Sequence, residues 1–341
     1  MEIDKIRTDV PKRHGLAGYA PFVSIVVRSF QRPEALLELV ERLRLQNYPS
    51  FEIVVVEQSN NPGLEARLAS LRDSRLKVIA CSPLGAPAAR NEGIRHTCGD
   101  ILVFIDDDDL PIDDEWLTNH VANYSNPLCM GVVGRLTDNP GQIQRPRFPR
   151  LVHRLAFRYT FFKDPMTYAW GSLRKEGIDF LIGSNASVRR SLIERIGGWD
   201  EGIPVGEEQS FSFKFARNRK PGEQFIYDPK PIIWRRVNIE GGLNRRSKPD
   251  WYIRELNARI SYYHDVVAYY FPWRVRLLYP IFLLRTLEQV WEWIWDPDNN
   301  NRDAMERFKA CAAVVLHLPV SLHRRWRQGS SNRVSRIDHL I

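Results

Sequence analysis

The chain has 341 residues, of which 43% are hydrophobic and 26% are charged. These are ordinary values for a globular protein with a large core, and they exclude wholesale disorder. The formal net charge of +8 favours anionic partners such as nucleotide phosphates, nucleic acid or an anionic membrane surface, without choosing among them.

The cellular setting is indicated by what the sequence does not contain. Its first residues lack the apolar core of a signal peptide, and no uncharged apolar stretch is long enough to span a bilayer. The four cysteines are scattered without C-x-x-C spacing, which argues against a zinc knuckle or a disulfide framework and suits a reducing compartment. We therefore expect a cytoplasmic protein, free or at the inner face of the membrane.

The first half of the chain alternates between apolar β-branched stretches and stretches of helical periodicity, after a polar lead-in over residues 1–20. Strands are predicted over residues 22–27, 51–56, 76–80 and 101–106, with helices over residues 33–43, 64–71 and 87–96 between them. This alternation predicts a parallel sheet with right-handed crossovers, in which ligands bind outside the carboxyl ends of the strands. Arg28, Glu57 and Asp106 each follow such an end, so we expect them on one rim.

The strand ending at Asp106 runs into four consecutive aspartates, residues 106–109. Like charges at neighbouring positions repel, so a fold that keeps them together usually places a cation there. Oxygen ligands that leave sites for water and phosphates describe a Mg²⁺ or Mn²⁺ site. The alternative is an acidic, solvated turn helped by Pro111.

The second half continues with a predicted helix over residues 113–126 and a strand over 130–136. Residues 138–174 are irregular and rich in Pro, Arg and aromatics, as binding loops often are. The remaining predictions are a strand over 180–189, a helix from 191 to 196, a helix through 211–217 and a pair of short strands within 224–234.

The composition changes after about residue 242, where three helices rich in aromatic residues are predicted before a basic tail. The expected domains are a lead-in (1–20), a catalytic domain (21–242), a C-terminal helical extension (243–328) and a flexible tail (329–341). Three interpretations of the extension stay open: it packs on the catalytic domain, it forms a homodimer interface, or it contacts a membrane surface through its Arg, Trp and Tyr side chains.

Six segments resemble the motifs of a known family and occur in its order. They are VSIVVRSFQRPEAL, IVVVEQSNN, GAPAARNEGI, FIDDDD, FLIGSNASVRRSLIERIGGWDE and GEEQSFSFK. Over roughly residues 22–242 the chain resembles a family 2 glycosyltransferase of the GT-A fold, an inverting enzyme that uses sugar nucleotides. The resemblance implies an α/β fold: a mixed, mainly parallel sheet flanked by helices, here followed by the helical extension.

The resemblance also implies a function and its residues. A sugar would move from a nucleoside-diphosphate sugar to a hydroxyl of a saccharide or glycolipid acceptor, in cell-surface polysaccharide or glycolipid synthesis. The implied residues are Arg28, Glu57, Arg90, Asn91 and Asp106 for the donor, Asp106 and Asp108 for a Mg²⁺ or Mn²⁺ ion, Trp199, Asp200 and Glu207 for the acceptor, and Glu208 as catalytic base. Without the resemblance, Glu207 and Glu208 would be ordinary first-turn acids of a helix.

Two departures from the family pattern affect this assignment. Arg235 stands near the place of a metal-ligating His; because an arginine cannot ligate a metal, Arg235 or Arg236 would instead pair with the donor's phosphates. Glu replaces the usual Asp at Glu57 and Glu208, which moves each carboxylate by about a bond length.

Two other functions were weighed. A nucleic-acid-binding module would explain the positive charge and the Arg-rich tail, but not the acids gathered at strand ends. A nucleotidyltransferase would also hold a metal on paired acids, and a comparison of sugar nucleotides with nucleoside triphosphates would distinguish it from a sugar transferase. We therefore expect no nucleic-acid partner.

Overall fold

The computed structural model describes residues 20–138, 171–178, 180–201, 207–236, 239 and 241. The strands are β1 (Val23–Ser29), β2 (Phe51–Glu57), β3 (Leu76–Ala80), β4 (Ile101–Asp106), β5 (Asp109–Pro111), β6 (Cys129–Thr137), β7 (Lys175–Ile178), β8 (Ala186–Arg189) and β9 (Gln224–Arg235). The helices are α1 (Pro33–Arg44), α2 (Pro62–Ser70), α3 (Ala86–Arg95), α4 (Trp116–Ala122), the 3₁₀ helix η1 (Asn123–Ser125), α6 (Arg190–Ile196) and α7 (Glu207–Asn218).

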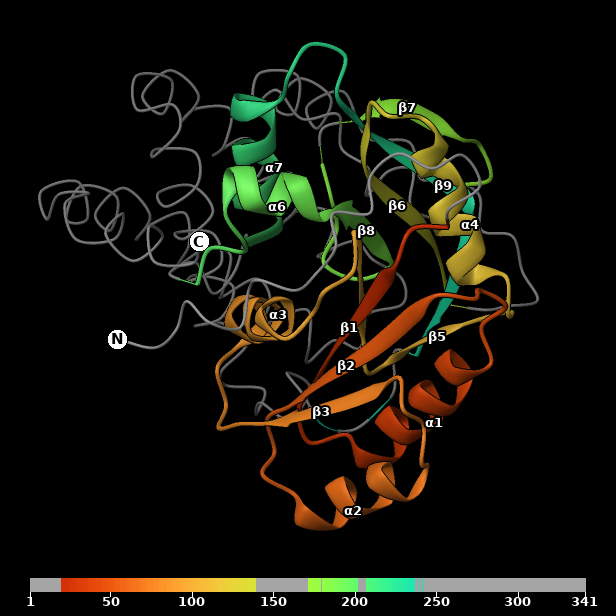
Figure 1. Cartoon of the computed structure of the whole chain (residues 1–341), viewed down its shortest axis with the longest axis vertical. Helices are drawn as coiled ribbons and strands as arrows, with labels where there is room; N and C mark the ends of the chain where they lie inside the picture. The colour runs from red at the N-terminus through yellow and green to blue at the C-terminus, as the bar shows by residue number, and fades with distance from the viewer. Residues whose placement is uncertain are drawn as a thin grey trace, which may run out of the picture.

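All nine strands belong to one sheet, in the order β3-β2-β1-β4-β8-β6-β9-β5, with β7 paired to β9 (Figure 1). β3, β2, β1, β4, β6 and β9 run in one direction, and β8, β5 and β7 run in the other. The expected mixed, mainly parallel sheet is therefore confirmed.

The chain reverses its direction across the sheet after β3. It moves outward from β1 through β2 to β3, then returns through α3 to add β4 on the other side of β1. Because such crossovers are right-handed, α3 covers one face of the sheet while α1 and α2 cover the other (Figure 1). The carboxyl ends of β1 and β4 therefore lie at a switch point, where open α/β sheets bind their ligands.

The core forms where β-branched strands meet the apolar sides of the helices. The central strands β1, β2 and β4 are buried on both faces, and α1 buries its leucines beneath them. α3 approaches unusually closely, because a Cβ on Gly93 would collide with the side chain of Val26. This close packing brings the start of α3 to the switch point.

Several predicted elements differ from the structure. The predicted strand over 180–189 is wrong before Ala186, because residues 180–185 form a connection in which Asn185 has a left-handed backbone (φ 56°). The pair of strands within 224–234 is one strand, β9, and the short strand β5 was not predicted.

The remaining expectations concern segments outside the described residues: nearly all of the lead-in, most of the loop over 138–174, the helical extension and the tail. Within the part of the chain that the structure describes, no helix has the length and apolar character needed to cross a bilayer.

Candidate active site

Arg28 and Asp106 meet at the switch point, because they stand at the carboxyl ends of β1 and β4. They are register partners, and Arg28 Nη2 donates to Asp106 Oδ2 at 2.5 Å. Glu57 lies on the neighbouring strand β2, one position further along, since it pairs in register with Ser29. The sequence prediction that these three residues lie on one rim, at the carboxyl ends of the parallel strands, is confirmed.

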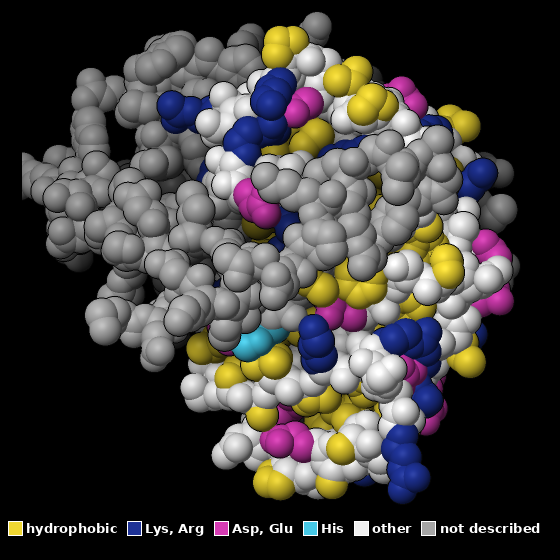
Figure 2. Space-filling model, in the orientation of Figure 1, with side chains coloured by type: hydrophobic (Ala, Val, Ile, Leu, Met, Phe, Trp, Pro, Cys, Tyr) yellow, Lys and Arg dark blue, Asp and Glu magenta, His cyan; other side chains and the backbone are white. Residues whose placement is uncertain are grey.

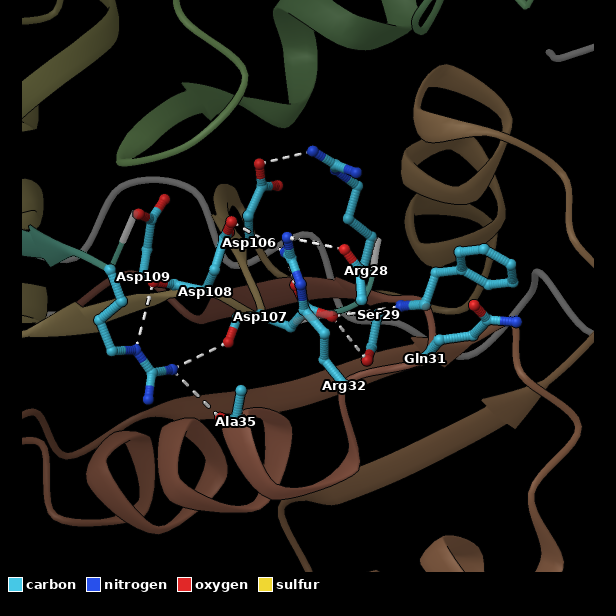
Figure 3. A network of polar contacts seen from close by, with 12 residues as sticks. Arg28, Ser29, Gln31, Arg32, Ala35, Asp106, Asp107, Asp108 and Asp109 are labelled. Carbon is cyan, nitrogen blue, oxygen red and sulfur yellow. Dashed lines mark hydrogen bonds and ion pairs between the residues drawn. The ribbon is translucent and has the colours of Figure 1, made fainter. Parts of the chain in front are cut away.

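Three of the four aspartates converge just beyond β4 (Figure 3). One carboxylate oxygen from each of Asp106, Asp108 and Asp109 lies within 4.8 Å of the other two. Asp106 Oδ1 is buried and accepts no hydrogen bond from the described residues. A set of hard oxygen donors, one of them buried without a hydrogen bond, fits a divalent cation such as Mg²⁺ or Mn²⁺.

Asp107 has a different task, because its side chain faces the loop after β1. It accepts hydrogen bonds from Ser29 Oγ at 2.9 Å, from the backbone N–H of Phe30 at 3.2 Å and from Arg32 Nη1 at 2.8 Å. Arg32 Nη1 also lies 2.8 Å from Asp108 Oδ2. Asp107 and Arg32 therefore fix the β1–α1 loop against the turn of residues 106–109, which we call the aspartate turn (Figure 3).

The aspartates differ in how strongly their surroundings favour the charged form. Burial raises the pKa of Asp106, but the charges of Arg28 and Arg90 outweigh it, so the pKa falls below its usual value. Burial raises the pKa of Asp109 to about 6, supported by the charges of Asp106 and Asp108 and opposed by Arg235.

Arg235 and Arg236 both hold the aspartate turn, by different atoms. Arg235 donates to the Asp109 carboxylate through Nε at 3.2 Å and Nη2 at 3.3 Å. Arg236 donates instead to backbone carbonyl oxygens, those of Asp107 at 3.0 Å and Asp108 at 3.3 Å. Arg235 is thus in direct contact with Asp109 of the acid cluster.

The adjacent acids Glu207 and Glu208 begin α7 and have different partners. Glu207 Oε1 accepts from Arg90 Nη1 at 3.1 Å, whereas Glu208 Oε1 accepts from the backbone N–H of Gly183. Burial and the neighbouring charge of Glu207 raise the pKa of Glu208 to about 7, against the opposing effect of Arg90. A carboxyl group poised near neutral pH is suited to accept a proton.

Arg90 joins this acid pair to the aspartate cluster. Its guanidinium is buried, with Nη2 3.7 Å from Asp106 Oδ1 and the Glu207 contact on its other side. The same group lies over the Trp199 ring, 4.7 Å from its centroid. A stacked, ion-paired arginine is held in one orientation, which prepares a fixed positive charge beside the acids.

Two residues assigned from the resemblance occupy unexpected surroundings. Trp199, expected on the acceptor side, is 1% exposed and packs against Phe104 and Phe211. Asn91, expected beside the diphosphate, accepts from Trp199 N at 2.7 Å and donates to Trp199 O and Glu201 Oε1 at 2.8 Å each. The side-chain carbonyl oxygen and the side-chain NH₂ group of Asn91 therefore both hold the loop after α6.

Asp200 follows Trp199 on that loop and is half-buried. Its charge raises the pKa of Lys214, although burial dominates and lowers that pKa to about 8. Lys214 in turn donates to the carbonyl of Gly198. The loop carrying Asp200 is thus held from α3 and from α7.

Glu57 ends β2 in a fully buried position. Its Oε1 accepts from the backbone N–H of Ser59 at 2.8 Å, and its Oε2 has no hydrogen-bond partner among the described residues. The neighbouring Gln58 accepts from the N–H groups of Leu84 and Gly85, at 2.9 and 3.2 Å. A buried acceptor without a partner is costly, and it marks Glu57 as a place where a ligand could donate.

The metal ligands assigned from the resemblance left out Asp109, although it belongs to the predicted acidic run, and no role was predicted for Ser184. Asp109 joins the cluster because it begins β5 and pairs in register with Arg235, which is a tertiary fact. Ser184 lies in a segment predicted as strand, but its hydroxyl contacts Asp109 and the backbone of Asp106. The only sequence signal was the GSN interruption of an apolar run, in which small polar residues suggest a turn.

Comparison with known proteins gives a consistent result. The family model described as "Glycosyl transferase family 2" matches residues 24–197, just over half of the chain. O-antigen biosynthesis protein RfbC of Myxococcus xanthus is 30% identical over 194 residues, which are 54% of this chain and 15% of that protein. O-antigen chain rhamnosyltransferase RfbN of Salmonella typhimurium is 20% identical over 214 residues, which are 62% of this chain and 65% of that protein. The chain spans less than two thirds of the length of these curated relatives.

Solved structures show the same fold. A mannosyltransferase from Pyrobaculum calidifontis, in complex with GDP-Man and Mn²⁺, has a TM-score of 0.52 at 19% identity, covering 94% of this chain and 79% of its own. GalNAc-T7 with UDP, GalNAc and Mn²⁺ also has a TM-score of 0.52, at 16% identity, covering 73% of this chain and 51% of its own. The GT-A fold is therefore confirmed.

Proposed function

Because the chain belongs to glycosyltransferase family 2, we propose that it transfers a sugar from a nucleoside-diphosphate sugar to a hydroxyl group of a saccharide or glycolipid acceptor. The observation that carries the proposal is the position of Glu208 beside the aspartate cluster. Gly183, which holds Glu208, is followed directly by Ser184, which holds Asp109. A base and a candidate metal site next to one another are what this transfer requires.

The reaction we propose is a single displacement with inversion. Glu208 accepts the proton of the acceptor hydroxyl while that oxygen forms a bond to the anomeric carbon of the donor. The bond from the anomeric carbon to the diphosphate oxygen breaks, and its electron pair leaves with the diphosphate. The pKa of about 7 allows Glu208 to take up the proton and to release it again near neutral pH.

The donor would bind over the switch point. Glu57, with its unpartnered Oε2, would accept from a nucleobase N–H, and Arg28 and Arg90 would face the diphosphate beside Asp106. A divalent cation held by Asp106, Asp108 and Asp109 would neutralise the charge that develops on the leaving diphosphate. Arg235, in contact with Asp109, would stand near the same phosphates.

The acceptor would approach from the loop after α6 and the start of α7. We propose Asp200 and Glu207 as contacts to acceptor hydroxyls, since Glu207 pairs with Arg90 and Asp200 directly follows Trp199, on which Arg90 stacks. Trp199 and Asn91 are both buried, so they would hold the loop that carries Asp200 in place and would not touch the acceptor themselves. This division of roles replaces the direct contacts that the resemblance implied for both residues.

The other functions considered receive less support. The family match is to sugar transferases, which favours sugar transfer over nucleotidyl transfer. On the face in Figure 2, Lys and Arg side chains of the described residues are interspersed with Asp and Glu, not gathered in one continuous basic stripe. A nucleic-acid-binding face would be expected to show such a stripe.

Polysaccharide or glycolipid synthesis at the inner face of the membrane is the setting we propose. The named relatives RfbC and RfbN support it, because their names refer to O-antigen synthesis.

The proposed function is tested by a panel of sugar nucleotides and nucleoside triphosphates, each with and without Mn²⁺, in a thermal-shift assay. We expect one class of sugar nucleotide to raise the melting temperature in the presence of Mn²⁺, because ligand binding to the native state stabilises it. That donor should then be consumed with release of the nucleoside diphosphate. Stabilisation by triphosphates alone, with release of pyrophosphate, would instead establish nucleotidyl transfer.

A further inference from the structure

Two consecutive residues, Gly183 and Ser184, contact the proposed base and the aspartate cluster respectively. The backbone N–H of Gly183 donates to Glu208 Oε1. The hydroxyl of Ser184 donates to Asp109 Oδ2 and accepts from the backbone N–H of Asp106 at 3.1 Å. Because the two residues are consecutive, with Cα atoms about 3.8 Å apart, one peptide unit links the contact with Glu208 to the contact with Asp109.

We propose that Ser184 is a positioning residue that sets the metal-binding carboxylates at a fixed separation from the base. The inference rests on the proposed function, because it takes Glu208 as the base and the aspartates as the metal ligands. Ser184 acts through Asp109 and the backbone of Asp106, and it does not itself touch the substrate.

The two hydrogen bonds of the Ser184 hydroxyl fix its orientation. A hydroxyl has one proton to donate, and here that proton goes to the Asp109 carboxylate while a lone pair receives the Asp106 N–H. Asp109 receives Arg235 on the other side. With these partners, Asp109 is held in one rotamer before a cation arrives, which is how neighbouring hydrogen bonds orient metal ligands.

The segment that carries Ser184 is itself anchored from behind. Asn185 has a left-handed backbone, and its Oδ1 accepts from Trp116 Nε1 at 2.7 Å. Its Nδ2 donates to the carbonyls of Arg135 at 2.8 Å and Pro231 at 3.1 Å. A conformation of this kind persists only where the surroundings determine it, so the position of Ser184 is set by the sheet.

Gly183 brings the same segment close to the base. A Cβ at this position would lie 2.8 Å from Glu208 Oε1 and would collide with the guanidinium of Arg90. Only glycine lets the peptide approach both groups, so its N–H can reach the carboxylate of Glu208. The Gly183–Ser184 pair is therefore fixed at both of its contacts.

The inference is tested by measuring Mn²⁺ affinity of the full chain by electron paramagnetic resonance, without donor. We expect Ser184→Ala to weaken Mn²⁺ binding by about tenfold, the order expected for a hydrogen bond to a charged group. Ser187→Ala is the matched control, because Ser187 lies three residues further on, in β8, and bonds His120 and Tyr124 instead. It should bind Mn²⁺ as the wild type does.

A second background separates positioning from a general structural role. Because Ser184 acts through Asp109 as well as through the backbone of Asp106, Ser184→Ala should cost less Mn²⁺ affinity in an Asp109→Ala chain than in the wild-type chain. Unchanged Mn²⁺ affinity of Ser184→Ala in the wild-type background would overturn the inference, and so would an equal loss in both backgrounds. If Ser184→Ala does not fold, Ser184→Cys keeps the size with a weaker donor and carries the same expectation.

Failure of this inference is distinguishable from failure of the proposed function. The Mn²⁺ measurement needs no sugar nucleotide, so it reports on Ser184 whatever the donor is. A wild-type chain that binds Mn²⁺ but neither binds nor consumes any sugar nucleotide would refute the function and leave the Ser184 result standing.

Discussion

Glu207 and Glu208 show how two identical neighbours acquire different chemistry. Adjacent positions at the start of a helix point about 100° apart, so the two side chains meet different surroundings. Glu207 is ion-paired with Arg90, whereas Glu208 is held by one backbone N–H and its pKa rises to about 7. The group without a full ionic partner is the better base.

The first prediction follows from this difference. Glu208→Gln keeps the size and most hydrogen bonding but removes basicity, so we expect the transfer rate to fall by roughly a hundredfold or more with donor affinity nearly unchanged. Glu207→Gln is the matched control and should mainly change binding. The measurement is kcat and donor Kd for both. A normal kcat for Glu208→Gln beside an inactive Glu207→Gln would assign the base to Glu207.

The raised pKa of Glu208 also predicts a pH dependence. Only the ionised form accepts a proton, so kcat/KM should rise with pH through about 7 and level off above it. The free energy of unfolding changes with pH in the opposite direction. The folded state holds the Glu208 proton more tightly than the unfolded state does, so the stability contributed by Glu208 falls as pH rises from about 4.5 to 7. Both trends should disappear in Glu208→Gln, and a flat kcat/KM profile in the wild type between pH 5.5 and 8 would contradict the assignment.

A third prediction concerns Asp108, the most exposed member of the acid cluster at 26% of its side chain. Asp108→Ala, or EDTA added to the wild type, should abolish Mn²⁺-dependent donor stabilisation and lower transfer on the order of a hundredfold. Asp114→Ala is the control, since Asp114 is exposed beyond β5. Transfer by Asp108→Ala at the wild-type rate, insensitive to EDTA, would show that the cluster holds no catalytic ion.

At the scale of elements, the sequence predicts the parallel half of the sheet well because its signals are local. Runs such as FEIVVV are short, rich in β-branched residues and bounded by turn residues, so β2 and its neighbours follow from local sequence. The switch-point residues follow in turn from the positions of the strand ends.

The other half of the sheet depends on contacts that periodicity does not report. A pair of short strands is predicted within residues 224–234, yet β9 continues without a break through Pro229 and Pro231. β7 pairs with residues 225–227 and β5 with residues 233–235, so the prolines lie between the two partners, where no strand requires their missing N–H groups. β5 and the turn at Asn185 are likewise specified by tertiary partners, which is why Asp109 and Ser184 escaped prediction.

The connection between α3 and the loop after α6 gives a fourth prediction. Asn91→Ala would leave the buried N–H and carbonyl of Trp199 without partners, so we expect a loss of about 3 kcal/mol in the free energy of unfolding. Glu92→Ala, which removes only partly exposed ion pairs, should cost less than about 1 kcal/mol. Urea unfolding measures both.

The same variant distinguishes two roles for Asn91. If Asn91 contacted the diphosphate, as the resemblance implied, Asn91→Ala would raise the donor KM and leave the unfolding midpoint unchanged. A lowered midpoint with an intact donor KM would establish the supporting role that its hydrogen bonds indicate.

At the scale of the whole molecule, the described residues form one sheet with its site at one rim, and the sequence after residue 242 has a different character. That segment contains WRVRLLYPIFLLRTLEQVWEWIW over residues 273–295, where arginines are interspersed among apolar and aromatic residues. Such composition predicts surface that must be covered, by the catalytic domain, by a second copy or by lipid.

The last prediction tests what the extension covers. A chain ending after residue 242 keeps the contact from Arg32, in the β1–α1 loop, to the carbonyl of Gly241 at 3.5 Å, so this anchor of the loop is retained. We nevertheless expect it to aggregate, because apolar surface paired with the extension would be exposed to water. Light scattering of both chains, and flotation of the full chain with anionic liposomes, distinguish intramolecular packing, dimerisation and membrane contact. A soluble, active monomer from the shortened chain would show that the extension is a separate attachment, because a domain that loses necessary cover cannot remain monodisperse.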